Sequence, residues 1–175
     1  MAFKDNSHIY IGFGTMVLLL GGALVVYKMS KSKPKSAIYR RKGITVDLSV
    51  FDSPDAPGSG NCMDRRLIAM LHNLSVKTGY PIFDWINSGA RSEAHNSKVG
   101  GVRNSSHKVP NCKAVDIKAS STSVRNRLVT AAREVGFKRI GVGNTFVHLD
   151  VDENKSQYVA WGYPSGSRPA INPFV

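Results

Sequence analysis

Two segments of the chain carry residue types that can bind a metal ion. Residues 88–118 contain His107 and Asp116, and residues 146–152 contain His148. Two imidazole nitrogens and one carboxylate can hold one zinc ion and leave its fourth tetrahedral position open to water, as catalytic zinc sites do. A structural zinc site would more often use thiolates, and the chain has only two cysteines. These residue types therefore indicate a catalytic site with Zn²⁺ as the cofactor.

The residues around His148 alternate as a strand does. Along residues 146–152, Phe146, His148 and Asp150 fall on one face and the apolar residues between them on the other. The apolar face belongs to a core, so the face with His148 must look into a cleft. A second short strand is expected over residues 114–119, which contain Asp116.

Helical periodicity is clear in two other stretches. Residues 63–79 repeat apolar residues three and four positions apart, with Asp64 at the start and Gly79 at the end. Residues 120–137 predict a second helix that ends at Gly136, and short strands are expected over 43–48, 81–89 and 138–143. The fold class predicted is α+β, with helices that flank a small, mainly antiparallel sheet.

At these residues the chain resembles the M15 family of zinc peptidases. The resemblance is greatest to its D-alanyl-D-alanine carboxypeptidase-like branch, which includes phage endolysins. It runs from about Phe51 to Trp161, through FDSPDAPGSG, SGARSEAHN, VGGVRNSSH, AVDI, GFKRIGVG and FVHLDVD in the family's order. The resemblance implies the M15/hedgehog-like fold over residues 43–175 and hydrolysis of peptide bonds in peptidoglycan.

The resemblance assigns roles to individual residues. The family's S-x-H, A-x-D and F-V-H segments make His107, Asp116 and His148 the metal ligands. Arg91 matches an arginine that faces substrate and stabilises a developing oxyanion, and its alternative is a surface arginine that holds its loop by salt bridges. Ser105 would either bind substrate or form the turn before His107.

The first departure from the family pattern is the loop between the first two ligands. The family usually has six residues there, with a glycine, whereas eight residues separate His107 from Asp116 and include Cys112. Three roles are open for Cys112: an inhibitory fourth ligand, a disulfide with Cys62, or a small buried residue.

The second departure concerns the general base. Better-known members place Glu or Asp three residues before the last ligand, where this chain has Thr145. Asp150 is the nearest carboxylate and is either the catalytic base or a partner that orients a ligand imidazole. His95 is a further candidate for the base, and its alternative is an ordinary loop residue.

The N-terminal region reads as a membrane anchor. After a tail of residues 1–8, residues 9–27 contain 19 residues without a charge, enough at about 1.5 Å per residue to span a bilayer as a transmembrane helix. A cleavable signal peptide is the alternative, but its apolar region is usually shorter and ends at a small-residue cleavage site. Residues 28–42 follow as a basic linker with seven Lys and Arg. This composition favours a flank near anionic lipid over a nucleic-acid-binding arm.

The sequence thus predicts a single-pass, membrane-anchored zinc peptidase, phage-encoded and used in cell-wall penetration or lysis. It would act as a D,D-carboxypeptidase or an endopeptidase. Its partners would be peptidoglycan, the lipid membrane through residues 9–27 and other virion or membrane proteins, with no nucleic acid. The basic flank argues for a cytoplasmic side, which a virion membrane protein would satisfy; a bacterial inner-membrane enzyme is the rival. The alternative function is a degenerate wall-binding or structural protein that keeps the M15 fold.

Overall fold

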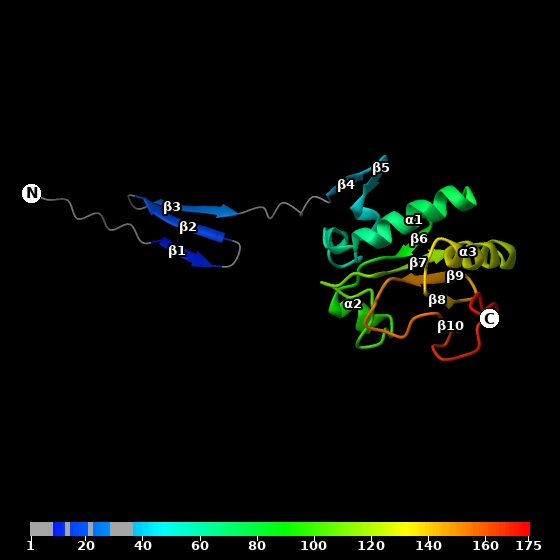
Figure 1. Ribbon diagram of the computed structural model, residues 1–175. Helices are drawn as coiled ribbons and strands as arrows, with labels where there is room; N and C mark the ends of the chain where they lie inside the picture. The colour runs from blue at the N-terminus through cyan, green and yellow to red at the C-terminus, as the bar shows by residue number, and fades with distance from the viewer. Residues whose placement is uncertain (1–8, 13–14, 21–22, 29–36) are drawn as a thin grey trace, which may run out of the picture. The chain divides into compact units, whose positions relative to one another are not determined.

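The computed structural model describes residues 9–12, 15–20, 23–28 and 37–175 (Figure 1). The chain divides into two compact units, Met1–Lys33 and Pro34–Val175. The described residues of the first unit form an antiparallel sheet in the order β1-β2-β3. Its strands are β1 (Ile9–Gly12), β2 (Thr15–Leu20) and β3 (Ala23–Lys28).

The helix predicted over residues 9–27 is not shown by the structure. No helix in the part of the chain that is described is long and apolar enough to cross a membrane. Glycines divide this stretch of sequence into short runs rich in Val, Ile and Leu, and a short apolar run suits a strand as well as a helix. The membrane anchor stays a prediction, and residues 1–8 and most of the predicted basic linker lie outside the described residues.

The second unit begins with a hairpin that the sequence did not predict. Strand β4 (Ile38–Arg41) pairs with β5 (Ile44–Asp47) through a two-residue turn at Lys42 and Gly43, both with positive φ. The sequence prediction places residues 38–41 in the basic linker. They join the domain because Tyr39 is buried, with the Arg65 guanidinium 5.1 Å from its ring centroid. The compact unit therefore includes β4, which lies before the predicted boundary at residue 43.

A five-stranded sheet forms the centre of this unit, in the order β10-β8-β9-β7-β6. All its pairings are antiparallel except that of β10 with β8, so the prediction of a mainly antiparallel sheet is confirmed. The strands are β6 (Ile86–Ser88), β7 (Ala114–Lys118), β8 (Arg139–Val142), β9 (Phe146–Asp150) and β10 (Val159–Gly162).

Both predicted helices are present. Helix α1 (Arg65–Thr78) starts where the Asp64 carboxylate accepts from two backbone amides, and it ends at Gly79 in the left-handed conformation. Helix α3 (Thr122–Glu134) is capped by Ser121. The two helices contact each other, and α3 contacts β8 and β9. A short third helix, α2 (Glu93–Lys98), precedes the loop that carries His107.

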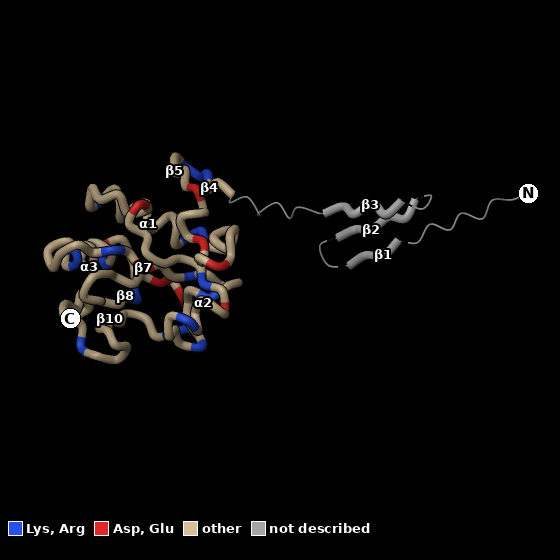
Figure 2. The backbone as a smooth tube through the Cα atoms, turned by 180° about the vertical axis from the view of Figure 1, so that it is seen from behind, with Lys and Arg blue, Asp and Glu red and all other residues tan. Residues whose placement is uncertain are grey.

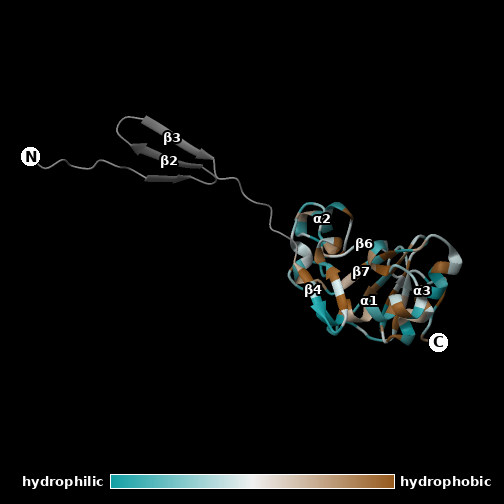
Figure 3. Cartoon of the chain, turned by 90° about the horizontal axis from the view of Figure 1, so that it is seen from above, coloured by the Kyte–Doolittle hydropathy of each residue, from teal (hydrophilic) through white to brown (hydrophobic). Residues whose placement is uncertain are grey.

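The core lies between these helices and one face of the sheet. Apolar residues of β7, α1 and α3 are visible in Figure 3, and their buried members form one cluster. Val115, Ile117, Val147 and Leu149 are all inaccessible to solvent, and each such side chain stabilises the fold by about 1.5–3 kcal/mol. Because strand residues alternate, burial of this set turns Asp116 and His148 to the opposite face.

Candidate metal centre

The polar face of the sheet carries a row of residues that are direct neighbours across the strands. Asp116 of β7 is the cross-strand partner of His148 of β9, and Ser88 of β6 is the next partner beyond Asp116. On the other side, Gly141 of β8 is the partner of His148, and Trp161 of β10 is the partner of Gly141. Strand register therefore places two of the predicted ligands side by side without help from any loop.

His107 comes to the same place from a loop. Its carbonyl accepts from the Arg91 amide at 2.9 Å, and its own amide donates to Ser105 Oγ at 3.3 Å. The Lys113 amide, just before β7, donates to the Ser106 carbonyl at 2.7 Å. These bonds fold the long connection between His107 and Asp116 back on itself, so the two additional residues do not separate the ligands.

The disulfide between Cys62 and Cys112 fastens this loop to the segment before α1. The Asp64 amide also donates to the Cys112 carbonyl at 3.1 Å. Of the three roles open for Cys112, the structure shows the disulfide. The thiol is therefore not a ligand, and the longer loop between the ligands is held by a covalent bond where the family pattern has a glycine.

Three ligand atoms converge at the bottom of this arrangement. His148 Nδ1 lies 2.9 Å from Asp116 Oδ1 and 3.1 Å from His107 Nε2, and the same carboxylate oxygen is 3.3 Å from His107 Nε2. All three residues are buried, and their ligand atoms lie within 4.8 Å of one another, as in a site that could hold a metal ion.

The outer nitrogen of each imidazole identifies the tautomer. His107 Nδ1 is 2.7 Å from the Gly89 carbonyl, and His148 Nε2 is 3.1 Å from Asp150 Oδ2. Both oxygens are acceptors, so each of these outer nitrogens carries a proton. In the neutral rings, the inner nitrogens, His107 Nε2 and His148 Nδ1, then each carry a lone pair. With both rings neutral, two lone pairs and a carboxylate oxygen would face one another with no hydrogen between them. This set fits a divalent cation, and its outer partners are those that metal-binding histidines usually have.

The charges of the site are strongly coupled. Burial would lower the pKa of His148, but hydrogen bonds to Asp116 and Asp150 raise it to about 9. Burial would raise the pKa of Asp116, but the two imidazoles hold it well below its ordinary value. Burial lowers the pKa of His107. A proton on His148 Nδ1 and a metal ion at the same atoms would therefore exclude each other, and metal binding would release the proton.

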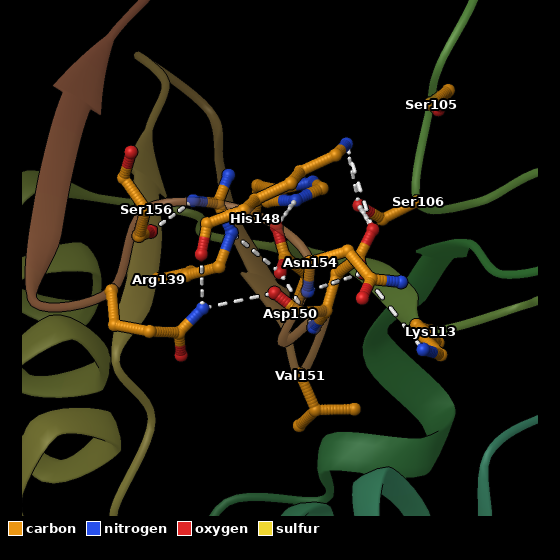
Figure 4. A network of polar contacts seen from close by, with 12 residues as sticks. Ser105, Ser106, Lys113, Arg139, His148, Asp150, Val151, Asn154 and Ser156 are labelled. Atoms are coloured by element: carbon orange, nitrogen blue, oxygen red, sulfur yellow. Dashed lines mark hydrogen bonds and ion pairs between the residues drawn. The ribbon is translucent and has the colours of Figure 1, made fainter.

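Asp150 uses both of its oxygens on neighbouring groups (Figure 4). Oδ2 accepts from His148 Nε2, and Oδ1 accepts from Arg139 Nε at 2.8 Å and from the Asp152 amide at 3.0 Å. Arg139 is held in turn by the Ser156 carbonyl. Despite burial, His148 and Arg139 keep the pKa of Asp150 below its ordinary value. Of the two roles that the sequence left open, this geometry favours the partner that orients the imidazole over a base free to face water.

Arg91 lies against a ligand and also lines the cleft. Its Nη2 donates to Asp116 Oδ2 at 2.5 Å and its Nε to Ser88 Oγ at 2.8 Å. Ser105 Oγ accepts from the His107 amide in the turn before it, and Ser105 also lines the cleft; its role in substrate binding stays a prediction. His95 lies on α2 and does not line the cleft, and Thr145 is exposed in the turn before β9.

The cleft over the metal centre has a volume of about 630 Å³. One wall is the loop after α2, with the exposed side chains of Val99 and Val102. The other wall is the segment after β10, which includes Tyr163 and Pro164. Burial, with the negative charge of Asp116, raises the pKa of Tyr163 to about 12. A peptide-sized ligand can therefore reach the open side of the three ligand atoms.

Four residues of this site were missed by sequence reasoning: Ser88, Arg139, Trp161 and Tyr163. Ser88 acts through a hydrogen bond to Arg91, three residues along the chain, and Arg139 acts through one to Asp150, eleven residues along. No sequence pattern marks either bond. Trp161 and Tyr163 stand in an aromatic stretch just before a turn rich in Pro, Gly and Ser. That stretch was the one available signal, because aromatic side chains in a loop often line binding sites.

Comparison with protein families gives a match over the metal centre. A family model described as Peptidase M15 matches residues 43–150, which include all three candidate ligands as well as Arg91, Ser105 and Asp150. No curated protein and no solved structure matches the chain. The matched region ends at the last residue of β9, so β10 and the Tyr163 segment lie outside it.

Proposed function

This chain belongs to the Peptidase M15 family, whose members are zinc-dependent peptidases, and on that premise we propose that it hydrolyses peptide bonds of peptidoglycan stem peptides or cross-links. The observation that carries the proposal is the convergence of His107 Nε2, Asp116 Oδ1 and His148 Nδ1 at the base of an open cleft. Three protein ligands with one open side are the arrangement of a catalytic zinc.

Zinc at these atoms would supply Lewis-acid polarisation of a carbonyl and activation of water near neutral pH. The residues of the chain orient the ligands and stabilise the developing charge. Asp150 keeps the proton of His148 on Nε2 and so leaves Nδ1 free as a ligand. Ser88 and Asp116 fix the Arg91 guanidinium at the rim of the centre, where its fixed charge can stabilise an oxygen that gains negative charge.

Peptidoglycan as the substrate rests on the resemblance to the carboxypeptidase-like and endolysin-like branch. The domain of residues 43–175 carries 16 basic and 11 acidic residues. Figure 2 shows basic residues on several of its elements, α3 among them. This modest positive charge suits contact with an anionic cell wall. The reaction would be that of a D,D-carboxypeptidase or an endopeptidase, used by a phage in cell-wall penetration or lysis.

For location, we propose a domain that faces an oxidising compartment. Disulfides persist in the periplasm and on virion surfaces and are rare in the cytosol, and the Cys62–Cys112 bond supports such a placement. Residues 9–27 would anchor the chain in a virion membrane or a bacterial inner membrane. Protease digestion of intact spheroplasts or purified particles tests this, because a domain cut in intact spheroplasts faces the periplasm.

The activity is tested with the full chain and purified peptidoglycan. The zinc-loaded protein, the same protein after chelation, and the variant His148→Ala are incubated in parallel, and the released fragments are read by mass spectrometry. Asp84→Ala is the matched control, because Asp84 is exposed and does not line the cleft. We expect zinc-dependent loss of D-alanine or opening of cross-links with the parent and the control only.

One observation favours a second function, a wall-binding or structural protein that no longer cleaves. Among the described residues, the carboxylates that line the cleft are Asp116 and Asp150, and both are engaged with neighbouring groups. Under this alternative the protein sediments with peptidoglycan and holds zinc, but zinc-loaded protein releases no fragment. The experiment above therefore separates the two functions.

A further inference from the structure

Tyr163 reaches the metal-binding face of the sheet from a segment outside the family match. It follows β10 directly, whereas the match ends at residue 150. Its ring centroid lies 4.8 Å from that of Phe146, and the residue is 37% exposed, with its ring on the wall of the cleft. Tyr163 is therefore anchored by one aromatic contact and accessible to a ligand.

Gly141 makes room for the Tyr163 hydroxyl beside a metal ligand. A β-carbon on Gly141 would lie 2.8 Å from that hydroxyl and 2.9 Å from the β-carbon of His148. Glycine within a strand weakens the strand and often marks a close approach of another group. Here the group is the phenol, which occupies the place of the missing side chain and lies over the cross-strand neighbour of His148.

The phenol and the Arg91 guanidinium flank the ligand atoms from opposite sides. In the sheet order, β8 with Gly141 lies on one side of β9, and β7 and β6 lie on the other. Arg91 is bonded to Asp116 of β7 and Ser88 of β6, while Tyr163 covers β8. A peptide carbonyl brought to the centre along the cleft would therefore meet polar hydrogens on both sides.

We propose that Tyr163 is a catalytic residue of this site, whose hydroxyl donates a hydrogen bond to the scissile carbonyl oxygen as negative charge develops there. The inference rests on the proposed peptidase function. A phenol is protonated at neutral pH, so it can donate this bond without giving up its proton. Loss of one such donor typically lowers kcat by about 10²–10³-fold. A tyrosine that served only as an apolar wall would keep kcat when its hydroxyl is removed.

The test is Tyr163→Phe in the full chain, which keeps the ring against Phe146 and removes only the hydroxyl. Tyr158→Phe is the matched control, because Tyr158 is 57% exposed and does not line the cleft. We expect Tyr163→Phe to hold zinc as the parent does, with unchanged KM and a kcat about 10²-fold lower. Thermal unfolding confirms that both variants are folded.

A second measurement does not depend on turnover. A phosphinate analogue of the substrate carries its negative charge on oxygens where the developing oxyanion would be, and its affinity is measured by calorimetry. We expect Tyr163→Phe to bind it about 10²-fold more weakly and Tyr158→Phe to bind it as the parent does. An active parent with equal kcat and equal phosphinate affinity in Tyr163→Phe overturns the inference alone. An inactive zinc-loaded parent overturns the proposed function and the inference with it.

Discussion

The two halves of the metal centre are held by different means. The strand half consists of Asp116 and His148, which lie on neighbouring strands, where register and a buried apolar face fix their positions. The loop half is His107, whose position is fixed by local hydrogen bonds and the Cys62–Cys112 disulfide. A ligand on a strand can move only if the core moves, whereas a ligand in a loop can move if the hydrogen bonds and the disulfide that hold the loop are removed. The longer ligand loop of this chain is compatible with a metal centre because hydrogen bonds and a disulfide hold it in place.

The largest effect is expected from removal of a ligand in the strand half. Asp116→Ala deletes the only anionic ligand and leaves the Arg91 guanidinium beside two imidazoles without its partner carboxylate. We expect loss of bound zinc and of peptidoglycan cleavage to background. Zinc content after gel filtration measures the first, with Asp84→Ala as the control. Full zinc occupancy in Asp116→Ala would show that the strand half does not form the centre.

The way in which the loop half is held is tested by removing its disulfide. Cys62→Ser, Cys112→Ser and the double variant each remove the disulfide, and removal of a native disulfide from a small domain costs about 2–5 kcal/mol. We expect the three variants to lose similar free energies of unfolding and to release zinc faster to a chelator than the parent does. Denaturant unfolding and stopped-flow chelation measure the two effects. Unchanged zinc release would mean that the hydrogen bonds alone hold His107.

A smaller effect is expected from Asp150→Asn in the strand half. The change keeps the shape of the side chain but replaces one acceptor of the His148 bond or the Arg139 bond with a donor. Loss of such an outer partner typically lowers metal affinity by about 10–100-fold, and competition with a chelating dye measures it. Unchanged zinc affinity with lost activity would instead identify Asp150 as the general base.

The smallest effect is expected from Ser88→Ala at the edge of the sheet. The hydroxyl accepts one bond from Arg91 Nε, and a single hydrogen bond contributes about 0.5–1.5 kcal/mol. The bond from Arg91 Nη2 to Asp116 remains. We expect a kcat reduced by a few fold with zinc content unchanged, as measured by steady-state kinetics. A loss as large as that of Asp116→Ala would mean that Ser88 positions a ligand and not only the guanidinium.

Local signals predicted the elements well. Asp64 and Gly79 bound α1 as expected, because a side-chain cap and a left-handed glycine act within one helical turn. The alternation along residues 146–152 placed His148 on the cleft face, since the side-chain period of a strand leaves no other choice. The predicted strand over 81–89 is instead a 3₁₀ turn at Ile82–Trp85 followed by the short β6.

Contacts between residues that are distant in the sequence could not be predicted from it. Nothing near Cys112 distinguishes a disulfide from a free thiol, because its partner lies 50 residues away. The approach of Tyr163 to Gly141 depends on the parallel pairing of β10 with β8, which a pattern of strands does not specify. The oxygens of Asp150 accept hydrogen bonds from Arg139 and His148. The role of Asp150 as a partner that orients the imidazole follows only from that geometry.

We propose that the strand half and the loop half meet at one zinc ion. A crystal of the zinc-loaded chain, measured at the zinc absorption edge, tests it directly. We expect one anomalous peak, from a zinc ion bound to His107 Nε2, Asp116 Oδ1 and His148 Nδ1, with its fourth side open to the cleft and the Cys62–Cys112 disulfide intact. The absence of a peak at these atoms, or a zinc ion bound through His148 Nε2 or a Cys112 thiolate, would contradict it.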